Sequence, residues 1–431
     1  MKTLQTVTLG CSKNKVDTEH LLSQLCKAYE IVPEGEQRKV DCLIVNTCGF
    51  IGDAKEESIQ AILETAERKK RGEVGRLLVM GCLSQRYASE MPELIPEVDG
   101  WFGARDLAPV VRALGVEWDK SLDCGRYFTD HIRSYAFLKI SEGCDRRCSY
   151  CAIPFIRGAH KSVPIEKLVE EARFLASQGV KELVLIAQDT TYYGLDLYHR
   201  RALAELLQKL SEIEEIRWLR IHYSYPADFP EDVLEQMATN PKVCKYLDIP
   251  LQHISDNVLG MMRRSVDGEW TRRLVRTLRE RVPDVVLRTT MIVGHPGEGR
   301  KEFEELLSFV KEARFERLGA FCYSEEEGTF GAENYRDSVT GKTKQRRLDV
   351  LMSLQREISS EFNASRVGKE ELVLVDDIVD GTLVCRSQWE SPEVDGEILV
   401  PSNGKVRPGD FINVKIRSAS DYDLLADIID K

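Results

Sequence analysis

The sequence contains no apolar stretch approaching the ~18 residues that a membrane-spanning helix requires. The segment from Met1 to Lys15 includes no apolar core of the kind found in secretory signals. An excess of basic residues is also absent, because 60 Lys and Arg stand against 71 Asp and Glu, for a net charge of −11. The first absence excludes a helical membrane protein, and the second predicts a cytoplasmic location.

The acidic balance argues against a general nucleic-acid binder, because such proteins gain most of their affinity by neutralising phosphates. It favours a basic protein partner or a small substrate. The remaining composition is ordinary, with 42% hydrophobic and 30% charged residues. A chain of 431 residues with this composition is long enough to form several domains, each with its own hydrophobic core.

Twelve cysteines in a chain expected in a reducing compartment favour metal ligation over disulfides. Cys144, Cys148 and Cys151 lie within eight residues, directly after a strand-like apolar run at 135–140. Zinc in a closed structural site needs four ligands, and no fourth Cys or His has a matching spacing nearby. Three thiolates suit a [4Fe–4S] cluster that keeps one iron open for a small molecule. A zinc site and reduced structural thiols are the alternatives.

The first part of the chain alternates strand and helix patterns, which predicts a parallel sheet covered by helices. The expected elements are strands at 6–10, 43–45 and 77–80 and helices at 17–29 and 53–69. We expect Asp53 to cap the second helix.

Three further cysteines, Cys11, Cys48 and Cys82, each follow one of these strands. Because the carboxyl ends of parallel strands meet at one edge of a sheet, we expect these thiols to converge on a second cluster. The other six cysteines are expected to be structural. They are Cys26, Cys42, Cys124, Cys244, Cys322 and Cys385.

Beyond Gly158 the alternation of strands and helices continues at longer spacing. Strands are expected at 137–140, 183–187, 216–222, 246–249, 285–292 and 318–322, and helices include 165–177, 202–210 and 301–313. Polar residues gather after the strands, where β/α barrels bind their ligands.

The tail begins with a charged helix at 341–367 and then reads as a small β-barrel. Its expected strands are 371–378, 382–387, 397–401, 411–418 and 423–429. From Arg366 to Lys431, eight basic residues stand against fourteen acidic ones, for a net charge of −6. Such a surface repels phosphate and suits a basic partner, although a solvated surface with no partner is the alternative.

The first cysteine trio, with Tyr150 before its third member, resembles the radical S-adenosylmethionine (radical SAM) signature. Together with the second trio, nearly the whole chain resembles the methylthiotransferases, which are radical SAM enzymes with an additional N-terminal [4Fe–4S] cluster. The resemblance implies an α/β protein with four segments. These are a flavodoxin-like parallel-sheet domain at 1–125, an open (β/α)6 radical SAM barrel at 130–340, a helical linker at 341–365 and a five-stranded OB-like TRAM barrel at 366–431.

The resemblance also implies two [4Fe–4S] clusters and S-adenosyl-L-methionine (SAM) as cofactors, and a low-potential electron donor as a partner. The cluster on Cys144, Cys148 and Cys151 would cleave SAM to a 5′-deoxyadenosyl radical, and the cluster on the second trio would carry the sulfur. No catalytic acid or base is expected beyond the clusters. The expected SAM contacts are Tyr150, Gln188, Arg220, Gln252, Gly294, Pro296 and Gly297.

Four other polar residues are given weaker roles. Arg288 is expected either to contact a substrate carboxylate or to form an inward salt bridge, with neither favoured. His222, His253 and His295 are expected at the surface or in packing rather than in chemistry.

Two branches of the family differ in substrate, since one modifies an adenosine in tRNA and the other an aspartate in the small-subunit ribosomal protein S12. The residues at 9–17, with Lys13 where the tRNA branch typically has Met, resemble the protein-modifying branch. So do 152–158 and 391–396. We expect methylthiolation of the aspartate β-carbon, with the acidic TRAM domain binding the basic ribosomal protein and tRNA disfavoured. A tRNA methylthiotransferase and a non-catalytic iron–sulfur carrier are the alternatives.

Overall fold

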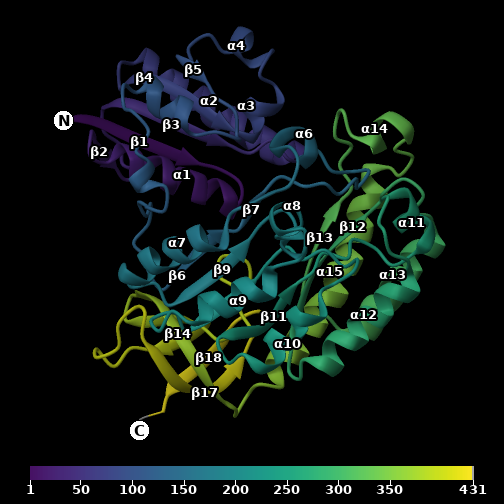
Figure 1. Cartoon of the computed structure of the whole chain (residues 1–431). Coiled ribbons are helices and arrows are strands. Elements are labelled where there is room, and N and C mark those ends of the chain that lie inside the picture. The colour runs from purple at the N-terminus through teal and green to yellow at the C-terminus, as the bar shows by residue number, and fades with distance from the viewer. Residues whose placement is uncertain (430–431) are drawn as a thin grey trace.

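The structure, a computed structural model, describes residues 1–429. Asp430 and Lys431, the end of the expected C-terminal domain, lie outside the described residues. Three sheets follow one another along the chain: an N-terminal sheet, a central sheet and a C-terminal barrel (Figure 1). Across residues 1–429, every helix is too short or too polar to cross a bilayer.

The N-terminal sheet has five parallel strands in the order β2-β1-β3-β4-β5, which is the flavodoxin-like order. The strands are β1 Lys2–Thr8, β2 Tyr29–Val32, β3 Val40–Thr47, β4 Val74–Gly81 and β5 Gly100–Trp101. The helices are α1 Ser12–Leu25, α2 Gly52–Lys70, α3 Cys82–Arg86, α4 Met91–Leu94 and α5 Ala108–Ala113, and a 3-10 turn follows at Lys120–Leu122.

Both faces of this sheet are buried, as expected for parallel strands whose crossovers are helices. On one face, Leu43 and Leu77 pack with Ile62 of α2. On the other, Ile44 packs with Leu21 of α1. Successive residues of β3 therefore serve opposite cores, which explains its continuous apolar run.

The sequence-based bounds in this region need three corrections. Strand β1 covers Lys2–Thr8 instead of 6–10, because the chain leaves the extended conformation at Gly10, whose φ is +90°. Helix α1 covers Ser12–Leu25 instead of 17–29, because Tyr29 already begins the short edge strand β2. Asp53 lies in the first turn of α2, but the residue at the N-cap is Ile51, so the predicted capping role is wrong.

The central sheet has six parallel strands in the order β13-β12-β11-β10-β9-β6, and its two edge strands do not pair, which confirms the open barrel. The strands are β6 Tyr135–Lys139, β9 Glu182–Ile186, β10 Trp218–Ile221, β11 Val243–Asp248, β12 Val286–Val293 and β13 Arg317–Cys322. A small hairpin, β7 Ser141–Glu142 with β8 Lys161–Ser162, follows β6.

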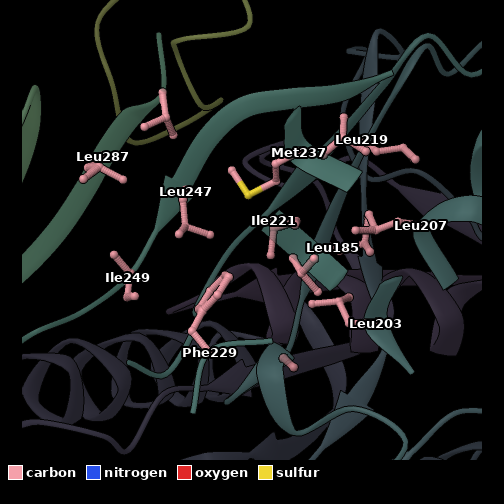
Figure 2. Close-up of a cluster of buried hydrophobic side chains, with 14 of the residues drawn as sticks. Leu185, Leu203, Leu207, Leu219, Ile221, Phe229, Met237, Leu247, Ile249 and Leu287 are labelled. Atoms are coloured by element: carbon pink, nitrogen blue, oxygen red, sulfur yellow. The ribbon is translucent and has the colours of Figure 1, made fainter. Parts of the chain in front are cut away.

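Helices cover the outer face of this sheet (Figure 1). They are α7 Ile165–Ser177, α9 Leu203–Ser211, α10 Glu231–Thr239, α12 Gly268–Arg281 and α13 Arg300–Ala313. The shorter helices α6 Ile153–Arg157, α8 Leu195–Tyr198, α11 Asp256–Met261 and α14 Phe330–Asn334 and a 3-10 turn at Thr190–Tyr192 lie in the connections between these elements. Figure 2 shows alternate strand residues, among them Leu185, Leu219 and Leu247, pointing toward Leu207 of α9 and Met237.

The C-terminal barrel is closed by five strands in the order β14-β15-β16-β18-β17, which confirms the OB-like prediction. The strands are β14 Glu370–Val379, β15 Thr382–Arg386, β16 Ile398–Pro401, β17 Phe411–Ala419 and β18 Leu424–Ile428. Before them runs the linker helix α15 Gly341–Ala364, whose Thr340 N-cap accepts a hydrogen bond from Thr343 N. Leu351 and Ile358 of α15 join the core of the central sheet.

The inner face of the central sheet is closed by parts of the other two units. Helix α1 places Val16 against Phe137 and Val184, which alternate with the outward residues of β6 and β9. From the C-terminal barrel, Ser391 Oγ contacts His222 Nε2 at 2.7 Å. The side chain of Asp395 accepts a 2.7 Å hydrogen bond from the Tyr246 hydroxyl. The open barrel therefore obtains its missing wall from both neighbours.

Candidate active site

The first cysteine trio lies in the loop between β7 and α6. Cys144, Cys148 and Cys151 line one cavity of about 580 Å³. The loop turns tightly, because Gly143 has a φ of +77° and a Cβ there would lie 2.1 Å from the Ala159 carbonyl oxygen. Only glycine fits this position, and it lets the Cys144 amide donate to the Gly158 carbonyl at 3.0 Å.

Burial raises the pKa of two of these thiols. It raises the pKa of Cys144 to about 12 and raises that of Cys151 still further. A buried thiol of this kind releases its proton when a metal takes the proton's place. The loop is thus suited to hold three thiolates only when a positively charged centre is bound.

The second trio lies at the ends of three adjacent strands, as the sequence predicts. Cys48 and Cys82 directly follow β3 and β4, and Cys11 precedes α1, just beyond β1. A Cβ at Gly10 would lie 2.6 Å from Cys48 Cβ and 3.0 Å from Cys48 Sγ. Gly81, at φ +106°, approaches Asn46 Oδ1 as closely, at 2.5 Å from a built Cβ. Glycines beside the cysteines therefore allow the three loops to converge.

Helix α6, which follows Cys151 closely, packs against α3, which begins at Cys82 (Figure 1). Cys82 packs with Ala152 and Ile156, which come directly after Cys151. Arg157, at the end of α6, donates from Nε to Cys82 Sγ over 3.3 Å. Cys82 of the second trio therefore lies against the short helix that directly follows the first trio.

Neither trio has the geometry of a single-ion site. Within residues 1–429, no three His, Cys, Asp or Glu side chains converge closely enough to hold one metal ion. Ligands of a cluster each bind a different iron, so they stand further apart than the ligands of one zinc ion.

Arg157 is the centre of a buried polar network between the trios. Its guanidinium donates to Asp17 at 2.8 Å, to Glu142 at 3.0 Å and to Asn14 at 2.6 Å. Lys139 also pairs with Glu142, at 2.8 Å, and with Asp17. Burial alone would raise the pKa of Glu142, but Lys139 and Arg157 lower it to about 2. The network keeps the Glu142 carboxylate ionised in the interior.

The residues expected to hold SAM supply buried polar atoms without partners. Gln188 donates to Glu142 at 2.6 Å, while its Oε1 is buried and has no hydrogen-bond partner within residues 1–429. The same holds for Gln252 Oε1 and Ser149 Oγ. Since buried polar atoms in proteins are normally satisfied, these atoms fit a polar ligand at this place.

The expected nucleoside loop packs closely against neighbouring side chains, and Tyr150 lies beside the first trio. Gly294 and Gly297 have φ angles of +77° and +89°, and a Cβ at Gly297 would lie 2.2 Å from Met261 Sδ. Between them, the Pro296 carbonyl accepts from His295 Nδ1 at 2.7 Å. Tyr150 lies beside the first trio, where Arg264 contacts its hydroxyl at 3.4 Å.

Arg220 does not lie with this group. It is fully buried, and it donates to Glu182 at 2.6 Å and to the Gln388 carbonyl at 2.7 Å. Glu182 in turn binds Arg386 of the C-terminal barrel at 2.7 Å. We therefore assign Arg220 to the junction between the two barrels, where buried charges need partners, and not to the cofactor.

Arg288 and the three histidines at 222, 253 and 295 take part in packing and in structural ion pairs. Arg288 forms the inward salt bridge, at 3.1 Å from Asp248. His222 is buried, which together with nearby cations lowers its pKa well below the usual value. His295 packs edge-on to Tyr323, and burial lowers its pKa to about 4. His253 is also fully buried, 3.5 Å from Glu298.

Sequence reasoning missed the polar residues that join the two trios. Glu142 and Arg157 flank the first trio in the sequence, and Asn14 follows Cys11 by three residues. Their closeness to the cysteines was the available signal, but only the fold shows that they contact one another.

Comparison with known proteins gives matches along the whole chain. Residues 3–103 match the uncharacterized protein family UPF0004, residues 138–310 the radical SAM superfamily and residues 367–429 the TRAM domain. The chain is 49% identical over 432 residues to the ribosomal protein uS12 methylthiotransferase RimO of Bacteroides thetaiotaomicron, covering 100% of this chain and 99% of that protein. It is 48% identical over 422 residues to RimO of Christiangramia forsetii, covering 98% and 93%.

Solved structures share the fold at low sequence identity. The radical S-adenosylmethionine methyltransferase TsrM from Kitasatospora setae, with cobalamin and a [4Fe–4S] cluster bound, aligns with a TM-score of 0.52 at 14% identity. The alignment covers 95% of this chain and 84% of that one. The cobalamin-dependent radical enzyme OxsB aligns with a TM-score of 0.52 at 13% identity, over 83% and 56% of the two chains.

Proposed function

The chain belongs to the RimO family of radical SAM methylthiotransferases, and on that premise we propose that it attaches a methylthio group to the β-carbon of an aspartate in ribosomal protein uS12. The observation that carries this proposal is that α6, which directly follows the first cysteine trio, packs against Cys82 of the second trio. A methylthiotransferase needs one centre that activates an unreactive carbon and another that delivers sulfur. Both must reach the same carbon, so they must lie close together.

In this proposal Cys144, Cys148 and Cys151 hold a [4Fe–4S] cluster beside a bound SAM. Cluster and SAM together supply the hydrogen-abstracting radical chemistry that an unactivated carbon requires. The side chains of Gln188, Gln252 and Ser149 would orient SAM through their unpartnered atoms. The chain's own contribution is to position these groups and to shield them from water.

We assign a second [4Fe–4S] cluster to Cys11, Cys48 and Cys82. Support comes from their place at three adjacent strand ends and from Gly10, which permits the close approach of Cys48. Arg157 supports the assignment further, because an N–H donor and a positive charge beside Cys82 Sγ stabilise a thiolate ligand.

The C-terminal barrel is the proposed binding surface for uS12, a basic protein. A groove of about 710 Å³ beside this barrel is lined by six carboxylates and by Arg386. The carboxylates are Asp376, Asp377, Asp380, Glu393, Asp395 and Glu397. Of these carboxylates, Asp376 is paired with Arg386 and Glu393 with Lys15. This concentration of negative charge favours a cationic protein segment and disfavours the phosphates of tRNA. A ribosomal substrate places the proposed activity in the cytoplasm, with a low-potential electron donor as second partner.

The test is to incubate the anaerobically reconstituted enzyme with SAM, reductant and either uS12 or tRNA. We expect mass spectrometry to find one methylthio group on an aspartate of uS12 and none on tRNA. The matched control is the enzyme with Cys144, Cys148 and Cys151 replaced by Ala, which we expect to leave uS12 unmodified. A methylthio mark on tRNA alone would refute the proposed substrate.

A further inference from the structure

Lys13 is a buried lysine whose ammonium is held by an aromatic ring instead of a carboxylate. Its side chain is 8% exposed, and Nζ lies 3.2 Å from the ring centroid of Tyr223. No Asp or Glu among residues 1–429 forms an ion pair with it, and within this range its ammonium donates no hydrogen bond. A buried charge is expensive to desolvate, and a ring face replaces only part of the lost hydration.

The other cations around Lys13 are paired. Lys15 binds Glu393 at 2.9 Å. Lys139, Arg157 and Arg288 bind Glu142, Asp17 and Asp248 at 2.8, 2.8 and 3.1 Å. Lys13 thus differs from its neighbours in retaining its full capacity to bind an anion.

Its position joins the second trio to the carboxyl end of the central sheet. Lys13 follows Cys11 by two residues, in the first turn of α1. Tyr223 comes two residues after β10, and its amide donates to Asp248 Oδ2 at 3.1 Å at the carboxyl end of the central sheet. The ammonium therefore connects the loop that carries one thiol of the second trio with the ligand-binding end of the radical SAM sheet.

We propose that Lys13 binds the carboxylate of the target aspartate and thereby selects an acidic side chain as substrate. This inference rests on the proposed function. The carbon to be modified is bonded directly to that carboxylate, so a cation next to the reacting carbon must meet it. An ammonium gives a strong charge-assisted hydrogen bond to a carboxylate, which an amide or a nucleobase does not equal. Before the substrate arrives, the face of Tyr223 holds the ammonium in place.

The test is a double-mutant cycle on binding, with the reconstituted holoenzyme and with uS12 whose target aspartate is native or replaced by Asn. We expect Lys13→Gln to raise the Kd for native uS12 about 10- to 100-fold. The Asn substitution should raise it by a similar factor for the wild-type enzyme. The two changes together should raise the Kd by no more than either change alone, because both remove the same contact.

Further variants distinguish an ion pair between Lys13 and the substrate from packing of the Lys13 side chain on Tyr223. Lys13→Arg keeps the charge and should recover most of the affinity, whereas Lys13→Met keeps the apolar stem on Tyr223 and should bind as weakly as Lys13→Gln. Lys39→Gln, at an exposed lysine of the same domain, is the matched control and should bind native uS12 as the wild type does. Iron content equal to that of the wild type confirms that each variant is folded around its clusters.

Two results would overturn the inference in distinguishable ways. If Lys13→Gln and the Asn substitution act additively, or if Lys13→Met binds native uS12 as tightly as the wild type, Lys13 only packs on Tyr223 and the proposed function stands. If the wild-type enzyme modifies no aspartate of uS12, the proposed function falls and this inference falls with it.

Discussion

Gly10→Ala tests whether the convergence of the second trio depends on the backbone at Gly10. The new Cβ would lie 2.6 Å from Cys48 Cβ, whereas ordinary contacts begin at 3.4 Å, so Cys48 must move by about 0.8 Å. Metal sites tolerate errors of only about 0.2 Å in ligand distance. The positive φ of Gly10, +90°, adds a backbone cost of about 1–2 kcal/mol.

Gly72→Ala is the matched control because it carries the backbone cost without the collision. Its φ is +74°, and nothing lies within 4 Å of the built Cβ. We therefore expect the two variants to lose similar stability from the backbone, while only Gly10→Ala loses the second cluster.

The assay is iron and sulfide content of anaerobically purified protein, followed by electron paramagnetic resonance of the reduced clusters. Gly10→Ala should retain about half of the wild-type iron, and Gly72→Ala should retain all of it. Wild-type iron content in folded Gly10→Ala would refute the reasoning, because the displaced Cys48 could then not be a ligand.

Three further predictions concern the buried charges and the SAM site. Arg157→Met removes the guanidinium and leaves buried carboxylates without their partner, so it should lower the free energy of unfolding at pH 7 by about 3–5 kcal/mol. Denaturant titration measures this change, and an unchanged midpoint would contradict the proposed polar network around Arg157. Burial opposes ionisation of Glu390, but Arg366 and Arg317 lower its pKa from 4.5 to about 2. The ionised Glu390 should therefore add about 3 kcal/mol to the free energy of unfolding. This contribution should be complete above pH ~4.5 and should be lost as the pH falls toward 2. Glu390→Gln should flatten that part of the pH profile in the metal-free protein, and an unaltered profile would show that other groups dominate. Gln188→Ala and Gln252→Ala should each raise the Kd for SAM about tenfold in equilibrium dialysis, and an unchanged Kd for both would place SAM elsewhere.

Regular elements with strong periodicity could be predicted from the sequence. Helix α7 covers Ile165–Ser177 as predicted, because its apolar residues repeat at helical spacing between two clear strands. The five strands of the C-terminal barrel also lie within a residue or two of their predicted positions. The edge strands β2 and β5 were missed because they are short and bury few residues.

The site was predictable where it follows from topology and not where it depends on contacts between units. Cys11, Cys48 and Cys82 could be placed together because parallel strands end at one edge. Arg220 was misplaced because a polar residue on a barrel strand resembles a ligand contact, and only the fold reveals its partner Glu182. The unusual environment of Lys13 likewise depends on the packing of α1 against the end of β10.

The central claim is that each trio holds its own cluster and that the two centres act on one carbon. The most direct measurement replaces Cys11, Cys48 and Cys82 together by Ala and determines iron content and reductive SAM cleavage in the same sample. The account predicts that about half the iron remains and that 5′-deoxyadenosine is still formed. Unchanged iron, or loss of all iron and of SAM cleavage together, would contradict two separate clusters.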